Sequence, residues 1–472
     1  MLESLIYFSP VTILLVALLV LMFGERDENN AYGCFRFSRT MLLLSFGLAV
    51  IFYNKSTIVG LTVGNKFTLL FDSLLYGSGL ALLYPSRKWF VSMNFPAHIF
   101  CGCLFLCILS GSLLICSDNL ALTAVCCSTM LIGNYIMLKQ GDNKKETDLG
   151  NKVYMVTAIC AMVLLAIATA ILYEKNGSTA YSELRTMLAI NKDDPLLFAA
   201  IGMFVTVFVL LLGMAPLHFC ASEVLGKTIL PVFMYFLLVP FSAVWGGFIR
   251  FNISIAEPIF GQLRLFYMSA ALLSVGIGAI GACSGQNIRK IFAYSSVFYS
   301  GIIFLTIRKF TLNAVSSGFV YLILYMFAIY GICICLFGIK KKGDYLFMLS
   351  DFEGAAQKRP YISAMMLIFM LSLLGLPPFS GFIGLFASLN YLALHHHFYQ
   401  LVYLLSMMAV IAYAYLQIIR VMYFVDKRTL FDKVDSGIHM AIFLNMILMI
   451  VITLQPQYLL TGFRSMLEVL FL

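Results

Sequence analysis

The sequence predicts an all-α integral membrane protein with about fourteen transmembrane helices. Of its 472 residues, 61% are hydrophobic and 11% are charged, whereas a typical soluble domain carries about 25% charged residues. The apolar residues form runs that approach the roughly 20 residues a helix needs to cross a bilayer. No alternating strand pattern appears, and a helix satisfies its own backbone hydrogen bonds in lipid. A protein with a mainly water-facing surface is therefore excluded.

The apolar runs give the positions of the predicted spans. The first run lacks a basic start and a small-residue cleavage site, so it is predicted to be a retained span and not a signal peptide. The C-terminal stretch 457–472 is predicted to be a short interfacial tail. The fourteen spans are predicted at 4–23, 39–54, 67–84, 97–116, 119–138, 154–173, 196–214, 229–250, 264–283, 291–307, 313–338, 360–392, 399–424 and 438–455.

The basic residues predict the orientation of these spans. Loops after odd-numbered spans contain 20 Lys and Arg residues, and loops after even-numbered spans contain nine. Lys and Arg accumulate in loops on the cytoplasmic or matrix side of a membrane. The odd loops are therefore predicted to lie on that side, and both termini on the other. The net charge of +9 is explained by topology and not by a nucleic-acid partner.

Two of the predicted spans contain a break. Pro216 follows Gly213 in span seven, and Pro377 and Pro378 follow Gly375 in span twelve. Proline removes a backbone donor and clashes with the preceding turn, and paired interruptions of this kind are typical of inverted-repeat transporters. Spans seven and twelve are five apart, which predicts two inverted five-helix repeats. Two ordinary proline kinks are the alternative.

The repeats predict four segments of the chain. A three-span N-terminal segment covers 1–96, and the two five-helix repeats cover 97–250 and 264–424. A C-terminal span and tail cover 425–472.

Three motifs carry a resemblance to a known family. The first contains Ala215-Pro216-Leu217-His218-Phe219, then Glu223 and Arg250, the second is 287–301, and the third is 371–384. Together they resemble the antiporter-like membrane subunits of respiratory NADH:quinone oxidoreductase (complex I), above all subunit N of bacteria and subunit 2 of mitochondria. Their order and spacing cover about residues 98–424. Cation/proton antiporter subunits share these motifs.

The resemblance implies a line of buried ionisable side chains that moves protons at mid-membrane. Such groups are costly in lipid and usually mark a pathway. This chain departs from the family at all four relay positions, where a glutamate and three lysines are implied. Tyr299 also stands where many members carry histidine. The residues at the four relay positions are Ser128, Leu211, Phe241 and Leu385. Pumping by the usual mechanism is therefore not expected.

Five polar residues near the motifs remain candidates for an ion pathway. The alternatives are helix caps for His218 and Glu223 and positive-inside anchors for Arg289 and Lys290. The candidates are His218, Glu223, Arg250, Arg289 and Lys290.

The sequence predicts no cofactor and no metal site. Gly-rich nucleotide loops and paired Cys motifs do not occur in it. Adjacent residues on a helix do not share a face, so His395, His396 and His397 do not predict a metal site. If the complex is an oxidoreductase, its redox chemistry belongs to partner subunits.

The predicted function is that of a complex I membrane-arm subunit, associated with proton translocation coupled to electron transport but lacking the usual relay. A structural role and transport by another route both stay open. The predicted partners are other membrane subunits, especially neighbouring antiporter-like ones, and lipid, with no nucleic acid. The predicted location is an energy-transducing membrane, either the bacterial or the mitochondrial inner membrane. Two alternatives remain: a subunit of a multisubunit cation/proton antiporter, and a scaffold that transports nothing.

Overall fold

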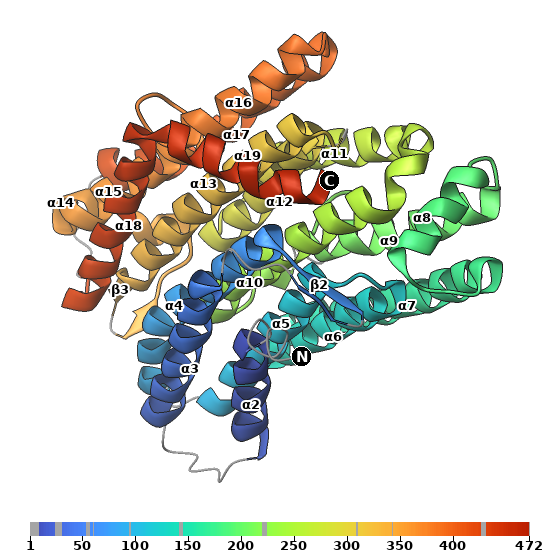
Figure 1. The fold of residues 1–472 in the computed structure, drawn as a ribbon. Coiled ribbons are helices and arrows are strands. Elements are labelled where there is room, and N and C mark those ends of the chain that lie inside the picture. Colours follow the sequence, from blue (N-terminus) through green and yellow to red (C-terminus); the bar gives the residue numbers. More distant parts are fainter. Residues whose placement is uncertain are drawn as a thin grey trace. The chain divides into compact units, whose positions relative to one another are not determined.

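The computed structural model describes residues 9–23, 31–52, 57–59, 61–93, 96–140, 145–219, 224–307, 310–341, 343–425 and 431–471. Figure 1 labels the elements along the chain. The helices are α2 (Ser9–Phe23), α3 (Ala31–Ile51), α4 (Lys66–Met93), α5 (Ala97–Cys116), α6 (Leu120–Lys139), α7 (Lys145–Asn176), α8 (Tyr181–Ile190), α9 (Pro195–Leu211), α10 (Leu230–Phe251), α11 (Phe260–Cys283), α12 (Ile288–Ile307), α13 (Leu312–Phe337), α14 (Ala355–Lys358), α15 (Pro360–Leu373), α16 (Gly381–Leu394), α17 (Phe398–Phe424), α18 (Ser436–Leu454) and α19 (Pro456–Phe471).

The described helices confirm the predicted all-α membrane fold. Ten helical stretches in the described residues are long and apolar enough to cross a membrane, with α10 and α11 counted as one stretch. Four further apolar helices, α2, α9, α15 and α16, are shorter. Each predicted span overlaps at least one described helix. The number of helices that cross the membrane stays a prediction.

Two short hairpins and the surface helix α8 (Tyr181–Ile190) are among the elements that were not predicted. Strands β1 (Thr57–Val59) and β2 (Thr62–Gly64) pair antiparallel, as do β3 (Lys340–Lys341) and β4 (Asp344–Tyr345). Helix α8 buries Tyr181, Leu184 and Leu188 on one side, which is the helical period of an amphipathic segment. All of these elements lie in the connections between predicted spans. The apolar runs used to locate the spans do not predict the structure of these connections.

The first compact unit contains Met1–Leu212, Met234–Leu265 and Met466–Leu472. Helices α2, α3, α4 and α5 pack side by side in it (Figure 1). Helix α10 approaches α5 closely through glycines. A Cβ atom on Gly111 would lie 2.6 Å from Ala243 Cβ, and one on Gly247 would lie 2.5 Å from Leu114 Cγ. Small residues allow this approach, and close packing holds membrane helices together.

The second compact unit contains Gly213–Phe233 and Phe266–Ser465. Helix α13 is buried along most of its length and packs against α12, α15, α16 and α18. Helices α11 and α12 meet through two glycines. A Cβ atom on Gly278 would lie 2.5 Å from the backbone nitrogen of Phe298, and one on Gly301 would lie 2.8 Å from that of Val275. Backbone therefore packs on backbone at this contact.

Gly278→Ala is expected to destabilise the second unit, because the added methyl group would overlap the α12 backbone. Overpacking of this kind costs about 1–3 kcal/mol. Gly202→Ala is the matched control, since a Cβ atom at this α9 position meets no described atom within 4 Å. Thermal unfolding in detergent should give a lower midpoint for the first variant and an unchanged one for the second. Equal midpoints would contradict the close backbone contact.

Candidate functional site

The chain is interrupted in the same way at two places. Helix α9 ends at Leu211, Gly213 adopts a φ of 64°, and the Ala215–Pro216 bond is cis. Helix α15 ends at Leu373, Gly375 adopts a φ of 66°, and the Pro377–Pro378 bond is cis. Glycine suits both positions because it has no Cβ atom to oppose a positive φ. The predicted break residues Pro216, Pro377 and Pro378 thus lie in matching local structures, and all three are exposed. That each break divides one transmembrane span stays a prediction.

Side chains bind backbone groups at both breaks, and two of them come from distant parts of the chain. At the first break, the backbone N–H of Ala215 donates to Ser274 Oγ at 2.9 Å. At the second, the Tyr299 hydroxyl donates to the carbonyl of Leu373 at 2.6 Å, and the backbone N–H of Gly381 donates to Ser372 Oγ at 3.1 Å. Irregular backbone at membrane depth requires partners of this kind.

The three apolar relay positions contribute packing. Leu211 is the last residue of α9 and is half-buried. Phe241 is buried in α10, with its ring centre 6.4 Å from that of Trp245 in an edge-on arrangement. Leu385 is buried in α16 and covers Gly375, where a Cβ atom would lie 2.6 Å from Leu385 Cδ2. None of the three side chains can bind or release a proton.

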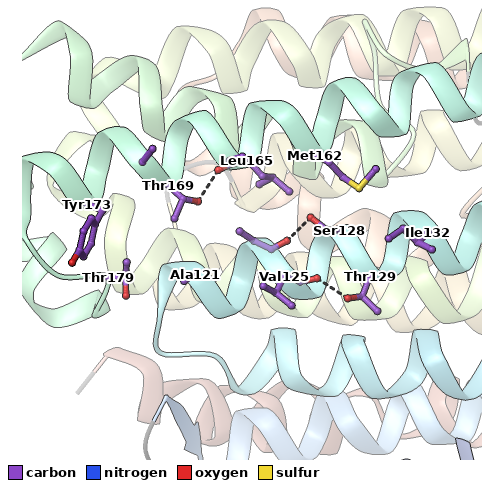
Figure 2. A pocket seen from close by; sticks show the side chains of 13 residues that line it. Ala121, Val125, Ser128, Thr129, Ile132, Met162, Leu165, Thr169, Tyr173 and Thr179 are labelled. Atoms are coloured by element: carbon purple, nitrogen blue, oxygen red, sulfur yellow. Dashed lines mark hydrogen bonds between the residues drawn. The ribbon is translucent and has the colours of Figure 1, made fainter.

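Ser128, the fourth relay position, faces an open groove between α6 and α7 (Figure 2). The groove has a volume of about 570 Å³ and a mostly apolar lining. The Ser128 hydroxyl donates to the Ala124 carbonyl of its own helix at 2.8 Å. The Ser128 hydroxyl, which stands in place of the implied glutamate, therefore donates its hydrogen bond within its own helix.

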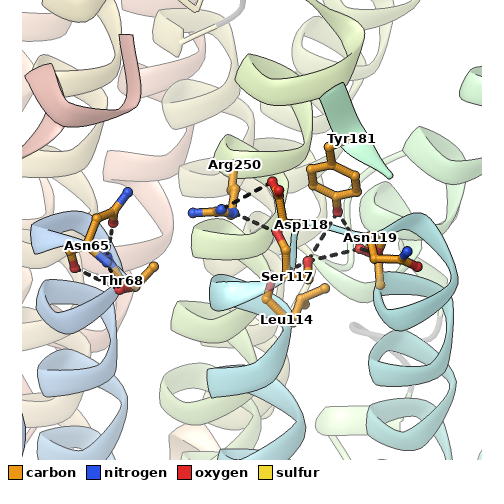
Figure 3. Close-up of polar contacts among 9 residues, drawn as sticks. Asn65, Thr68, Leu114, Ser117, Asp118, Asn119, Tyr181 and Arg250 are labelled. Atoms are coloured by element: carbon orange, nitrogen blue, oxygen red, sulfur yellow. Dashed lines mark hydrogen bonds and ion pairs between the residues drawn. The ribbon is translucent and has the colours of Figure 1, made fainter. Parts of the chain in front are cut away.

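Arg250 holds a corner of the first unit (Figure 3). Its side chain is buried in the last turn of α10, where Nε donates to the Ser117 carbonyl at 2.7 Å. Its Nη2 lies 3.6 Å from Asp118 Oδ1. Partial burial raises the pKa of the Asp118 carboxyl, and the Arg250 charge offsets part of that rise. Arg250 thus ties the end of α10 to the connection between α5 and α6.

A set of hydroxyl groups extends this corner (Figure 3). The Ser117 hydroxyl lies 3.0 Å from Thr123 Oγ1 and 3.1 Å from the Tyr181 hydroxyl. Thr123 and Tyr181 also share a hydrogen bond. Because Tyr181 opens α8, these bonds fix that surface helix to the ends of α5 and α6.

Arg289 and its neighbours bind the chain that leads into α10. The Arg289 guanidinium donates to the Thr228 carbonyl and lies over the Phe347 ring, 3.5 Å from its centre. The Asn287 side chain donates to the Gly226 carbonyl at 3.3 Å and accepts from the Arg289 backbone N–H at 2.9 Å. Arg289 is therefore an anchor within the second unit.

The structure brings His218 and Lys290 to the same aromatic ring. The ring centre of His218 lies 6.3 Å from that of Tyr294, and Lys290 Nζ lies 5.9 Å from the same centre. The first break and the start of α12 therefore meet in the second unit. Glu223, the remaining candidate, lies outside the described residues.

The structure contains a group of buried tyrosines that the sequence did not predict. Only Tyr299 was singled out from the sequence, as a substitution for histidine. Tyr321 and Tyr325 lie on α13 beside it, and Tyr415 lies on α17. A weak signal was present, because residues four apart share one face of a helix and Tyr321 and Tyr325 have this spacing. Their meeting with Tyr299 and Tyr415 depends on tertiary packing.

These features define a class of protein: a polytopic membrane protein with the paired interruptions that inverted-repeat transporters use. A family model supports a more specific statement. The NADH:quinone oxidoreductase/Mrp antiporter transmembrane family matches residues 117–412, and the chain belongs to this family.

Curated relatives align along almost the whole chain. NADH-quinone oxidoreductase subunit N 1 of Solibacter usitatus is 26% identical over 91% of this chain and 89% of its own length. NADH-quinone oxidoreductase subunit N of Paramagnetospirillum magneticum is 24% identical over 97% of this chain and 95% of its own length.

Solved structures share the fold. A chain of respiratory complex I from Thermus thermophilus superposes with a TM-score of 0.80 at 21% identity, over 96% of this chain and 98% of that one. A chain of the Mrp complex from a Dietzia species gives a TM-score of 0.84 at 15% identity, over 98% of this chain and 97% of that one.

Arg250→Met is expected to destabilise the first unit, because it leaves the Ser117 carbonyl and the Asp118 carboxylate without their partner. Losing hydrogen bonds to a charged group costs about 1–3 kcal/mol. Arg264→Met is the control, since Arg264 is exposed on α11. Protease resistance of the detergent-solubilised protein should fall for the first variant alone. If both variants resist equally, the corner contributes nothing.

Proposed function

We propose that this chain is a membrane-arm subunit of a respiratory NADH:quinone oxidoreductase, associated with proton translocation that is coupled to electron transport. The observation that carries the proposal is the alignment with proteins named subunit N over about nine-tenths or more of both lengths. The family and the membrane fold agree with it. NADH oxidation and quinone reduction belong to partner subunits, because the sequence contains no nucleotide loop or paired Cys motif.

The chain takes part in this complex without the usual Glu and Lys relay. Leu211, Phe241 and Leu385 cannot titrate, and each is at least partly buried by its neighbours. The Ser128 hydroxyl donates a hydrogen bond to the backbone of its own helix. These four positions therefore contribute structure. His218 and Lys290, which meet at Tyr294, are the candidates for an ion entrance on the cytoplasmic or matrix side.

The matching breaks support the two inverted repeats, 97–250 and 264–424. In both, the helix end, the left-handed glycine and a proline follow in the same order and spacing. A pair of unrelated kinks would have no reason to share these three features. The flanking segments 1–96 and 425–472 then lie outside the repeats.

The proposed partners are other membrane subunits of the complex, especially neighbouring antiporter-like subunits, together with lipid. The exposed residues of α17 are mostly apolar and include Val402, Leu405 and Leu416. Such a face suits hydrocarbon or a neighbouring transmembrane helix. The proposed location is the bacterial or mitochondrial inner membrane.

The second candidate is a subunit of a multisubunit cation/proton antiporter. The family description includes Mrp antiporters, and an Mrp complex chain has the same fold. Genomic neighbours separate the two candidates, because genes for redox subunits accompany the first and genes for small antiporter subunits accompany the second.

Purification of a tagged chain from membranes of its source organism tests the proposal. The chain is expected to co-purify with flavin and iron–sulfur subunits, and the assembly is expected to reduce quinone with NADH. Recovery with subunits that carry no redox cofactor, together with Na⁺/H⁺ exchange in vesicles, would support the antiporter instead. An untagged strain taken through the same steps is the control.

A further inference from the structure

Four tyrosines lie together inside the second unit and form a group that we call the tyrosine cluster: Tyr299 on α12, Tyr321 and Tyr325 on α13, and Tyr415 on α17. The ring centre of Tyr299 lies 5.0 Å from that of Tyr325 and 6.0 Å from that of Tyr321. All four side chains are buried. Three helices thus direct phenol groups into one place.

The hydroxyls of the tyrosine cluster are incompletely satisfied by protein. Tyr299 donates to the Leu373 carbonyl at 2.6 Å, and the Tyr415 hydroxyl faces those of Tyr299 and Ser295. Within the described residues, the Tyr321 hydroxyl has no hydrogen-bond partner. A buried hydroxyl without a partner is unfavourable. Buried polar groups that protein leaves unsatisfied are commonly bound by ordered water.

The tyrosine cluster lies at the second break, beside a relay position. Leu373, whose carbonyl Tyr299 binds, is the last residue of α15. Tyr321 packs on Gly384 of α16, where a Cβ atom would lie 2.5 Å from Tyr321 Cδ2. The next residue is Leu385, which occupies the position of an implied lysine. The phenol hydroxyls of the tyrosine cluster therefore lie near Leu385, where the implied lysine is missing.

We propose that the tyrosine cluster binds a short file of water molecules and conducts protons past Leu385 while every tyrosine stays neutral. A phenol hydroxyl both donates and accepts a hydrogen bond. Each phenol oxygen takes a proton from the water before it and releases its own hydroxyl proton to the water after it. One O–H bond forms for each that breaks. This inference rests on the proposed function, because partner subunits supply the driving force.

Replacing tyrosine with phenylalanine in the assembled complex tests the inference, since phenylalanine keeps the ring and removes only the hydroxyl. Tyr321→Phe and Tyr415→Phe, alone and combined, are expected to keep NADH:quinone turnover in proteoliposomes and to lower the number of protons moved per electron. The control is Tyr413→Phe, because Tyr413 lies on the same helix as Tyr415 and is exposed. This control should leave the ratio unchanged.

The outcomes separate this inference from the proposed function. If the wild-type assembly does not reduce quinone with NADH, the proposed function fails. If turnover persists and the proton-to-electron ratio is unchanged in the double variant, the tyrosine cluster does not conduct. A high-resolution density map of the wild-type complex adds a test that needs no variant. Density for water between the Tyr299, Tyr321 and Tyr415 hydroxyls is expected, and a dry cluster would overturn the inference.

Discussion

The structure depends on one constraint, which is that hydrocarbon offers no hydrogen-bond partner to the backbone. Continuous helices meet this constraint by themselves. At the two interruptions, other parts of the fold supply partners, such as Ser274 for the Ala215 N–H and Tyr299 for the Leu373 carbonyl. Both of these partners lie in the second unit, Ser274 on α11 and Tyr299 on α12.

The sequence predicted what local chemistry determines. Apolar runs located the helices, and Pro216 and Pro377 marked where two of them end, because a proline acts on its own turn. The corner at Arg250 was only partly predictable. The residue was singled out from a motif, but its bond to Ser117 joins positions 133 residues apart. The tyrosines that surround Tyr299 were missed for the same reason, since one sequence contains no distances between its distant parts.

The chain has the fold of its relatives but lacks titratable side chains at the four implied relay positions. Its backbone follows the complex I and Mrp chains along nearly their whole length, although the implied relay positions contain apolar side chains or a serine. A shared fold therefore does not by itself imply a shared chemistry. Glycine contacts such as that of Gly278 with the α12 backbone contribute to the helix packing.

The apolar side chain of Phe241 also has an electrical consequence. A membrane that stores a voltage needs every protein within it to resist ionic leakage. Placing a charge in a medium of low permittivity, away from water, requires a large electrostatic self-energy. In a membrane, a buried aromatic ring such as that of Phe241 would therefore act as insulation between two aqueous compartments. A region of this kind resists the passage of ions and so helps the membrane to hold its potential difference.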